Sequence, residues 1–416
     1  MLDELLKRDF VFTDNSNGWI LLKKGLKPGQ RPDIMNITAP DIVGDLQRKA
    51  VEAGSDIVFT NTFGANAKTL KATGYTVREL VGAAVAVSKK ACAGRALTAL
   101  DVGPIGEFIK PFGTLSFDES YGLYREQAVA AEEAGADLVA VETMSDLYEV
   151  KAVMRAVKEN TRLPLFVMMT FDKSGRTFTG CRPESFAVTA EALGAKAIGI
   201  NCSLAPAEIF PIAEKLIKST SLPVIIKPNA GLPNSMTGGY DISPEEFARQ
   251  MAPFASLGVK IVGGCCGTSS DYIRELKKTF SGLKPADLKG AAGERDASPR
   301  ICTWLRIESV DGLAYDPSMQ KFATEEEIIE NAVEQSDSSE KIVTVFLPEQ
   351  LAEARAGHII RSVQSQIDKP LYLISDNLLT LSAALHHVTG TPAISSPAGD
   401  KSALLAIASK YGAVVI

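Results

Sequence analysis

The segments PVIIKPNA (residues 223–230), PEEFARQMAPFASLG (244–258) and KIVGGCCG (260–267) hold the clearest fold signal in this chain. The first and third are short, apolar and rich in β-branched residues, which favours buried strands. The middle segment begins at a proline followed by acidic residues and ends at a glycine, as helices commonly do. Together they predict one strand–helix–strand unit of a parallel sheet that is covered by helices.

The same alternation extends back to Phe10. A second helix of this kind is predicted over PDIVGDLQRKAVEAG (40–54). Eight parallel strands joined by helices predict an α/β fold of the (β/α)8, or TIM, barrel type, which we expect over residues 1–282. The predicted strands are FVFTD (10–14), IVFTNTF (57–63), ALTALDVG (96–103), LVAVETM (138–144), LFVMMTF (165–171), AIGINCS (197–203), PVIIKPNA (223–230) and KIVGGCCG (260–267).

The composition changes after this barrel. Residues 283–300 are rich in Gly, Ala, Pro and charge, which predicts a linker. Residues 301–416 predict a smaller α/β region, with a helix over LLTLSAALHHV (378–388) and about four strands, half of what a second barrel needs. Those strands are IVTVFL (342–347), KPLYLIS (369–375), TPAISS (391–396) and GAVVI (412–416).

Composition also narrows the class of protein. The formal net charge is -6 and the isoelectric point is about 5.4, so the chain lacks the basic surface that nucleic acid or an anionic membrane requires. The apolar runs are shorter than the roughly 18 residues of a membrane span, and the N-terminus has no secretory apolar core. We expect a cytoplasmic protein that binds small molecules, with no nucleic acid and no membrane as partner.

The cysteines and histidines are distributed unevenly. In the reducing cytoplasm, we expect the six cysteines to be thiols or metal ligands rather than disulfides. The three histidines, His358, His386 and His387, all lie in the C-terminal region. The barrel must therefore do any chemistry without an imidazole, which excludes histidine triads and histidine metal ligands there.

Polar or metal-binding residues end every predicted strand. In a (β/α)8 barrel the carboxyl ends of the strands meet at one rim, where such enzymes keep their active sites. Polar residues can also simply mark the end of a strand, but the set as a whole favours a functional rim. Its members are Asp14, Asn61, Asp101, Glu142, Thr170, Cys202, Asn229, Cys265 and Cys266.

Three of these residues, Cys202, Cys265 and Cys266, are soft ligands at the ends of the sixth and eighth strands. Adjacent residues of a regular strand point to opposite faces, so Cys265 and Cys266 need distorted backbone to converge, which the flanking glycines allow. Three thiolates suit Zn²⁺ and leave its fourth position open for substrate. Three buried thiols or a vicinal disulfide are the alternatives.

An open position on such a zinc site suits a thiol substrate. Zinc lowers the pKa of a bound thiol, so that the thiolate forms at neutral pH and can attack a methyl group. No general base is needed at that step, which agrees with the absence of histidine from the barrel. The predicted chemistry is methyl transfer to sulfur.

Five motifs resemble one known family. TNTFGAN (60–66), ETMSDL (142–147), GINCS (199–203), KPNAGLPN (227–234) and GGCCGT (263–268) are similar to the homocysteine S-methyltransferase family, in particular to the N-terminal zinc- and homocysteine-binding module of cobalamin-dependent methionine synthases. The resemblance covers residues 10 to 281 and implies that Cys202, Cys265 and Cys266 bind zinc.

The resemblance also implies substrate contacts. Glu142 and Asp14 stand where the family binds the ammonium group of homocysteine, although from the residues alone either could cap a helix or pair with an arginine. Asn61, Thr62 and Asn229 are expected to donate or accept hydrogen bonds at the rim.

The chain departs from the family in the loop after the first strand. The family usually has DGAMGT there, where small residues let backbone amides reach the substrate carboxylate. This chain has DNSNGW (14–19), so the side chains of Asn15, Ser16 and Asn17 would have to supply the donors.

These points predict an enzyme that activates the thiol of homocysteine through zinc and methylates it with methylcobalamin, forming methionine. No corrinoid-binding module is visible, so we expect the donor on a separate corrinoid protein or module. Alternatives are a sulfonium donor such as S-methylmethionine, another thiol acceptor, or a zinc-binding docking scaffold. Residues 301–416 weakly resemble the first half of the pterin-binding barrel that follows this module in methionine synthases.

Overall fold

The computed structural model describes residues 1–26, 29–232, 239–287, 299–318, 322 and 324–416. The chain forms two compact units. The first comprises Met1–Thr179 and Ala195–Glu294, and the second Gly180–Gly194 and Arg295–Ile416. Most of the predicted linker (residues 283–300) and the end of the KPNAGLPN motif lie outside the described residues, so the predicted boundary stays a prediction.

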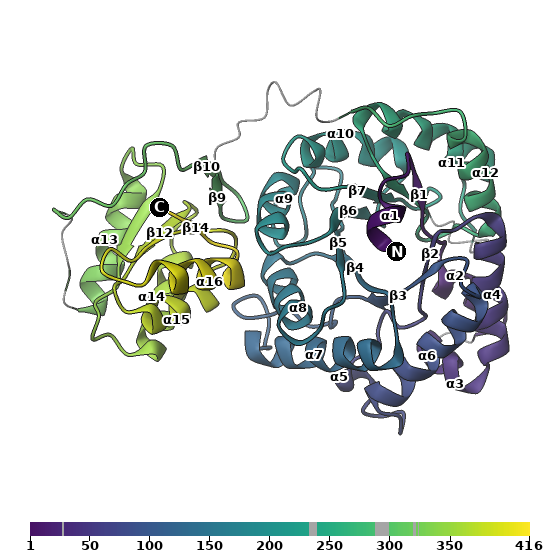
Figure 1. Ribbon diagram of the computed structural model, residues 1–416, viewed down its shortest axis with the longest axis horizontal. Coiled ribbons are helices and arrows are strands. Elements are labelled where there is room, and N and C mark those ends of the chain that lie inside the picture. Colours follow the sequence, from purple (N-terminus) through teal and green to yellow (C-terminus); the bar gives the residue numbers. More distant parts are fainter. Residues whose placement is uncertain (27–28, 233–238, 288–298, 319–321, 323) are drawn as a thin grey trace. The chain divides into compact units, whose positions relative to one another are not determined.

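The first unit contains the predicted parallel barrel (Figure 1). Its strands are hydrogen-bonded in the order β1-β8-β7-β6-β5-β4-β3-β2, and all eight predicted strands are confirmed, although most end earlier than predicted. Their bounds are β1 Val11–Phe12, β2 Ile57–Phe59, β3 Leu97–Val102, β4 Leu138–Met144, β5 Leu165–Met169, β6 Ala197–Asn201, β7 Val224–Lys227 and β8 Ile261–Val262.

Side chains help to close the barrel between β1 and β2. The Phe12 carbonyl accepts from the Asp56 N–H (2.7 Å), and the Asp56 carboxylate accepts from the Phe12 N–H (2.9 Å). Further along, the Asp14 carboxylate accepts from the Phe59 N–H (2.8 Å). These carboxylates satisfy backbone donors at the seam, so Asp14 has a structural role besides its place at the rim.

Both helices predicted in the barrel begin at the predicted proline, and one of them also ends at the predicted glycine. α4 (Pro40–Ala53) stops at Gly54, whose φ of 110° is the left-handed conformation that favours glycine. The segment predicted as one helix over 244–258 is α11 (Pro244–Met251) continued by the 3₁₀ turn η2 (Ala252–Leu257), where Pro253 interrupts the α-helix. The remaining helices and 3₁₀ turns from β1 to the end of β8's helix are α2 Asn17–Lys23, η1 Pro32–Ile34, α3 Met35–Thr38, α5 Ala67–Leu70, α6 Val77–Cys92, α7 Phe117–Ala134, α8 Leu147–Asn160, α9 Pro183–Ala192, α10 Pro206–Ile217 and α12 Ser270–Phe280.

An apolar core fills the amino-terminal end of the barrel. The short helix α1 (Leu2–Leu5) contributes Leu2 and Leu5 to the same cluster as Val11, Phe166 and Ile261 from the strands. α1 therefore closes this end, as Figure 1 shows in the view down the barrel. An active site is therefore expected at the opposite rim, which the carboxyl ends of the strands form.

The second unit is a separate α/β layer. Its four-stranded parallel sheet has the order β11-β12-β13-β14, and it confirms the four predicted strands. The antiparallel pair β9 (Arg300–Cys302) and β10 (Ile307–Ser309) was not predicted, because each strand has only three residues and no Gly-containing turn joins them. The other elements are α13 Glu325–Asp337, β11 Val343–Phe346, α14 Glu353–Gln364, β12 Leu371–Ile374, α15 Leu378–His386, β13 Ala393–Ser395, α16 Lys401–Tyr411 and β14 Val414–Val415, with α9 grouped in the same unit.

A buried carboxyl group on helix α8 makes the stability of the fold depend on pH. Glu149 on α8 is 3% exposed and accepts hydrogen bonds from the Ile105 N–H (2.9 Å) and the Tyr124 hydroxyl (2.7 Å). Burial raises its pKa from 4.5 to about 7, although both hydrogen bonds lower it. Because the folded-state pKa lies above the unfolded-state value, stability is lost as the pH rises through this interval.

We therefore expect Glu149→Gln to remove much of that loss. At pH 8 the variant should be more stable than the wild type by about 2 to 3 kcal/mol, and near pH 4 the two should be similar. Urea unfolding at both pH values measures this. Glu214→Gln, at an exposed site on α10, is the control and should keep the wild-type profile. A Glu149→Gln protein with an unchanged pH profile would contradict the prediction.

Candidate active site

The three predicted metal ligands converge at the carboxyl ends of β6 and β8. The Sγ atoms of Cys202 and Cys266 are 3.9 Å apart, and all three Sγ atoms lie within 4.8 Å of one another. A tetrahedral zinc ion with Zn–S bonds of about 2.3 Å places its sulfur ligands about 3.8 Å apart, so the trio fits such an ion. None of the six cysteines forms a disulfide in the structure.

The backbone at Cys202 is unusual. Cys202 (φ 61°) and Ser203 (φ 57°) adopt the left-handed conformation, which costs a residue with a side chain about 1–3 kcal/mol. The Cys202 N–H donates to the Lys227 carbonyl (3.0 Å), and the Leu204 N–H donates to the Cys202 carbonyl (2.7 Å). The sequence predicts distorted backbone at Cys265 and Cys266, and no local pattern indicates it at Cys202.

The loop after β8 brings Cys265 and Cys266 to one side by leaving the strand. Gly263 is needed for close approach, since a Cβ there would lie 1.9 Å from the Thr13 hydroxyl oxygen. The Cys265 N–H donates to the Pro228 carbonyl (2.8 Å), and the Cys266 N–H donates to the Asn229 side-chain oxygen (3.1 Å). Asn229 thus positions the metal-binding loop, and its predicted contact with substrate stays a prediction.

The pKa values of Cys265 and Cys266 are shifted in opposite directions. Hydrogen bonds from Cys202 and Cys265 lower the pKa of Cys266, whereas the hydrogen bond with Cys202 raises the pKa of Cys265.

A cavity of about 430 Å³ opens beside the cysteines. Among the described residues that line it, four are acidic and two are basic, so the walls favour a ligand that brings positive charge or hydrogen-bond donors. The described lining residues include Asp14, Asn15, Asn17, Arg31, Asp33, Asn61, Asp101, Glu142, Lys227, Cys202, Cys265 and Cys266. Asn17, which was expected to donate to a substrate carboxylate, already donates its amide to the Phe59 carbonyl (3.1 Å).

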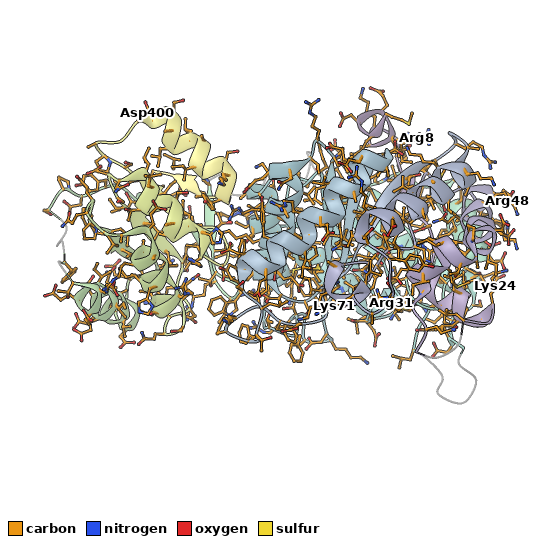
Figure 2. The ribbon with its side chains drawn as sticks, turned by 90° about the horizontal axis from the view of Figure 1, so that it is seen from below. Arg8, Lys24, Arg31, Arg48, Lys71 and Asp400 are labelled. Carbon is orange, nitrogen blue, oxygen red and sulfur yellow. The ribbon has the colours of Figure 1, made fainter. Side chains whose placement is uncertain are left out.

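Sequence reasoning missed Lys227 as a site residue. Basic side chains such as Arg8 and Arg48 project from the surface (Figure 2), with side-chain exposures of 61% and 52%. Lys227, at the end of β7, is 2% exposed. Its Nζ lies 3.1 Å from the Glu142 carboxylate, 3.6 Å from Asp14 and 3.5 Å from the centroid of the Phe59 ring. The sequence does hold a signal for this residue: a lysine inside the otherwise apolar segment PVIIKPNA indicates a buried charge that needs a partner.

Glu142 and Asp14, which were expected to meet a substrate ammonium group, thus face an ammonium group of the chain itself. Burial lowers the pKa of Lys227, but Glu142 and Asp14 outweigh this and raise the pKa above its usual value. Burial also raises the pKa of Asp14 to about 7, against the opposing effects of Lys227 and the Phe59 N–H. Whether either carboxylate also touches a substrate stays a prediction.

Asp101 at the end of β3 is held by two threonines. Its N–H donates to the Thr60 hydroxyl (3.0 Å), and its carbonyl accepts from the Thr62 hydroxyl (2.7 Å). The two hydroxyl oxygens are 2.7 Å apart. Because the single hydroxyl hydrogen of Thr62 is donated to the Asp101 carbonyl, Thr60 is the donor in the bond between the two threonines. Thr62 is fully buried and acts through Asp101, so its predicted substrate contact stays a prediction.

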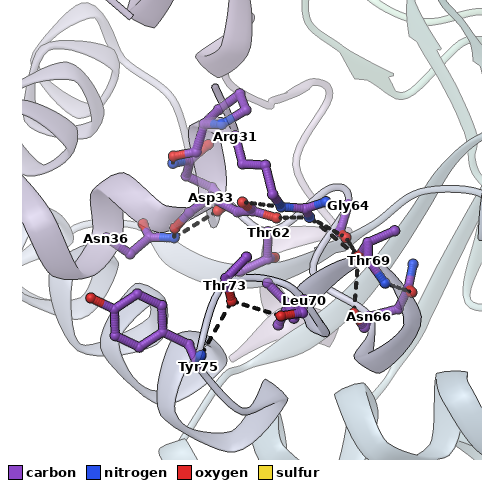
Figure 3. A network of polar contacts seen from close by, with 12 residues as sticks. Arg31, Asp33, Asn36, Thr62, Gly64, Asn66, Thr69, Leu70, Thr73 and Tyr75 are labelled. Carbon is purple, nitrogen blue, oxygen red and sulfur yellow. Dashed lines mark hydrogen bonds and ion pairs between the residues drawn. The ribbon is translucent and has the colours of Figure 1, made fainter. Parts of the chain in front are cut away.

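Arg31, Asp33 and Gly64 line another part of the cavity and belong to a polar network (Figure 3). The Arg31 guanidinium donates to the Asp33 carboxylate (3.1 Å) and to the Gly64 carbonyl (2.7 Å). Asn61, at the end of β2, donates its side-chain amide to the Pro32 carbonyl (2.6 Å) while lining the cavity. Asn61 therefore ties this loop to the barrel, and its contact with substrate is likewise untested.

The fold and the site together define a (β/α)8-barrel protein with a three-thiol metal-binding site at the carboxyl ends of its strands. The sequence profile of the family described as homocysteine S-methyltransferase matches residues 4–280. The chain belongs to this family, whose members are S-methyltransferases.

Comparison with individual proteins agrees with this membership. The chain is 34% identical over 262 residues to a methionine synthase of Mycobacterium leprae, a match that covers 59% of this chain and 22% of that protein. The chain thus spans about a fifth of the length of this curated relative.

Solved structures of the homocysteine methyltransferase MmuM of Escherichia coli share the fold. The metallated form matches with a TM-score of 0.56 and 20% identity, over 66% of this chain and 98% of that one. The oxidized form matches with a TM-score of 0.56 and 23% identity, over 67% and 97%. Within the described residues, no helix of this chain combines the length and apolar character needed to cross a bilayer.

Proposed function

We propose that this protein is a zinc-dependent homocysteine methyltransferase. The observation that carries the proposal is the convergence of the Cys202, Cys265 and Cys266 sulfur atoms within 4.8 Å beside an acidic cavity. Family membership and the likeness to a methionine synthase support homocysteine as acceptor. A solved relative has a metallated form, which supports a metal at the site.

The three cysteines would hold the ion, and the acceptor thiol would take the remaining position. Bound zinc would supply a lowered pKa for that thiol, so that it reacts as the thiolate at neutral pH. The left-handed backbone at Cys202 and the Asn229 bond to the Cys266 N–H fix the ligands before substrate binds, which reduces the entropic cost of binding.

The transfer replaces the donor–carbon bond and the S–H bond of the acceptor by one S–CH₃ bond and a solvated proton. A sulfur electron pair of the acceptor forms the new S–CH₃ bond, the donor–carbon bond breaks with its electron pair staying on the donor, and the thiol proton leaves to solvent. The likeness to a methionine synthase favours methylcobalamin, carried by a corrinoid protein or module outside this chain, as the donor.

One assay tests this proposal. Zinc-loaded protein with homocysteine should consume free methylcobalamin, followed by absorbance, and form methionine, whereas Cys202→Ala should not. A parallel reaction with S-methylmethionine tests a sulfonium donor: methionine formed in that reaction only would replace the proposed donor. If neither donor supports turnover, the enzymatic proposal is overturned in favour of a zinc-binding scaffold.

A further inference from the structure

Asn201, the last residue of β6, is buried beside the three cysteines and directly precedes Cys202. Its side-chain oxygen Oδ1 accepts from the Thr143 N–H (2.7 Å). Its side-chain nitrogen Nδ2 donates to the Thr143 hydroxyl (2.8 Å) and to the Cys265 Sγ (3.8 Å). One amide group therefore joins residues at the carboxyl ends of β4, β6 and β8.

The orientation of this amide group is fixed by Thr143. A backbone N–H can only donate, so the atom that accepts from Thr143 must be the amide oxygen of Asn201. The two hydrogens on the amide nitrogen then supply one bond to the Thr143 hydroxyl and one to the Cys265 sulfur. Cys265 thus meets a hydrogen-bond donor, the kind of partner that a metal-bound thiolate needs.

Strained backbone lies on both sides of the amide group. Thr143 (φ 63°) has the left-handed conformation and lies where the register between β4 and β5 shifts. Cys202 (φ 61°), the next residue in the chain, has the same conformation. Each such residue costs about 1–3 kcal/mol, and strain of this kind gathers at functional sites. The strain at Thr143 directs its N–H to Asn201, so it supports the bond to the metal-binding cysteine.

A hydrogen bond to the Cys265 sulfur matters because of charge. Three thiolates carry more negative charge than Zn²⁺ neutralises, and an acceptor thiolate adds more. A donor to a ligand sulfur withdraws electron density from it, which weakens its donation to the metal, and also fixes the direction of the side chain. The zinc ion then keeps more of its positive charge for the sulfur of the acceptor.

We propose that Asn201 is a positioning residue of the metal centre. Its amide donates to the Cys265 thiolate, orients this ligand and lowers its electron donation to zinc, while the Thr143 N–H holds the amide in place. This inference deepens the proposed function and rests on one part of it, a cation bound by the three cysteines. It depends on neither the identity of the acceptor nor that of the methyl donor.

Metal binding and absorption spectra test the inference without methyl transfer. Asn201→Ala should weaken zinc binding by about 10- to 100-fold, measured by competition with a chelator. In protein loaded with Co²⁺ in place of zinc, the sulfur-to-cobalt charge-transfer band should move to longer wavelength, because a sulfur without its donor gives up electrons more easily. The control is Asn160→Ala, which removes an amide that donates to the Tyr121 hydroxyl (2.7 Å) at the end of α8, and it should change neither quantity.

Thr143→Val separates the bond to sulfur from support of β4. This variant loses the threonine hydroxyl but keeps the N–H that orients Asn201, so the cobalt band should stay in place and zinc binding should weaken less than in Asn201→Ala. A second measurement needs no variant. In the wild type loaded with an NMR-active cadmium isotope, the N–H···S bond should give a scalar coupling between the Asn201 amide hydrogen and the cadmium nucleus.

An unmoved cobalt band in folded Asn201→Ala would overturn the inference, and so would the same band shift in Thr143→Val, which would leave Asn201 a support of β4 only. If Asn201→Ala does not fold, the cadmium coupling decides, and its absence from the wild type would overturn the inference. A shifted band in a protein that transfers no methyl group would refute the proposed methyl transfer while the role of Asn201 stands. A wild type that binds no cation at the cysteines would refute both.

Discussion

Replacing Cys202, Cys265 or Cys266 by alanine is expected to remove zinc binding, from about one ion per chain to none, because two thiolates and a solvent-exposed cavity cannot hold the ion tightly. Loss of the metal should lower methyl transfer by about a thousandfold or more, since a bound metal ion contributes several kcal/mol to such a step. The barrel should stay folded, because eight strands and their apolar core do not depend on the site. Metal analysis of dialysed protein and circular dichroism measure both effects.

The matched control is Cys92→Ala. Cys92 is a free thiol, 1% exposed, that packs with Val51 and Val58 away from the site, so this variant should keep its full zinc content. If all three ligand variants retained full zinc, the ion would be bound elsewhere and the assignment of the site would be wrong.

Lys227→Met should cause the largest loss of stability. The substitution keeps most of the side-chain volume but leaves Glu142 and Asp14 buried beside each other without their cation. Removing one partner of a buried ion pair costs about 3–5 kcal/mol. Since about 1 kcal/mol shifts the melting temperature of a domain of this size by about 2–4 °C, the barrel should unfold about 10 °C lower, measured by calorimetry.

Two further variants separate charge from packing. Lys227→Met combined with Glu142→Gln should recover part of the loss, because the unpaired carboxylate is gone. Lys218→Met removes a 72% exposed lysine that pairs with Glu214 on the surface, and it should change stability by less than about 0.5 kcal/mol. A Lys227→Met protein that melts at the wild-type temperature would show that the buried lysine is not a structural counter-ion.

The sequence alone was sufficient for the barrel, its eight strands and the three cysteines. Strands, helices and their end signals are local patterns, and residues that end parallel strands must meet at one rim. The hairpin of β9 and β10 was missed because its strands are too short for a pattern to show.

Only the tertiary structure decided how the rim is used. The Lys227–Glu142 ion pair joins residues 85 positions apart, and Asp14 meets the Phe59 N–H from 45 positions away. The left-handed backbone of Cys202 depends on a hydrogen bond to β7. These features depend on which side chains become neighbours when distant strands close into a barrel, so periodicity and spacing along the chain carry no signal for them.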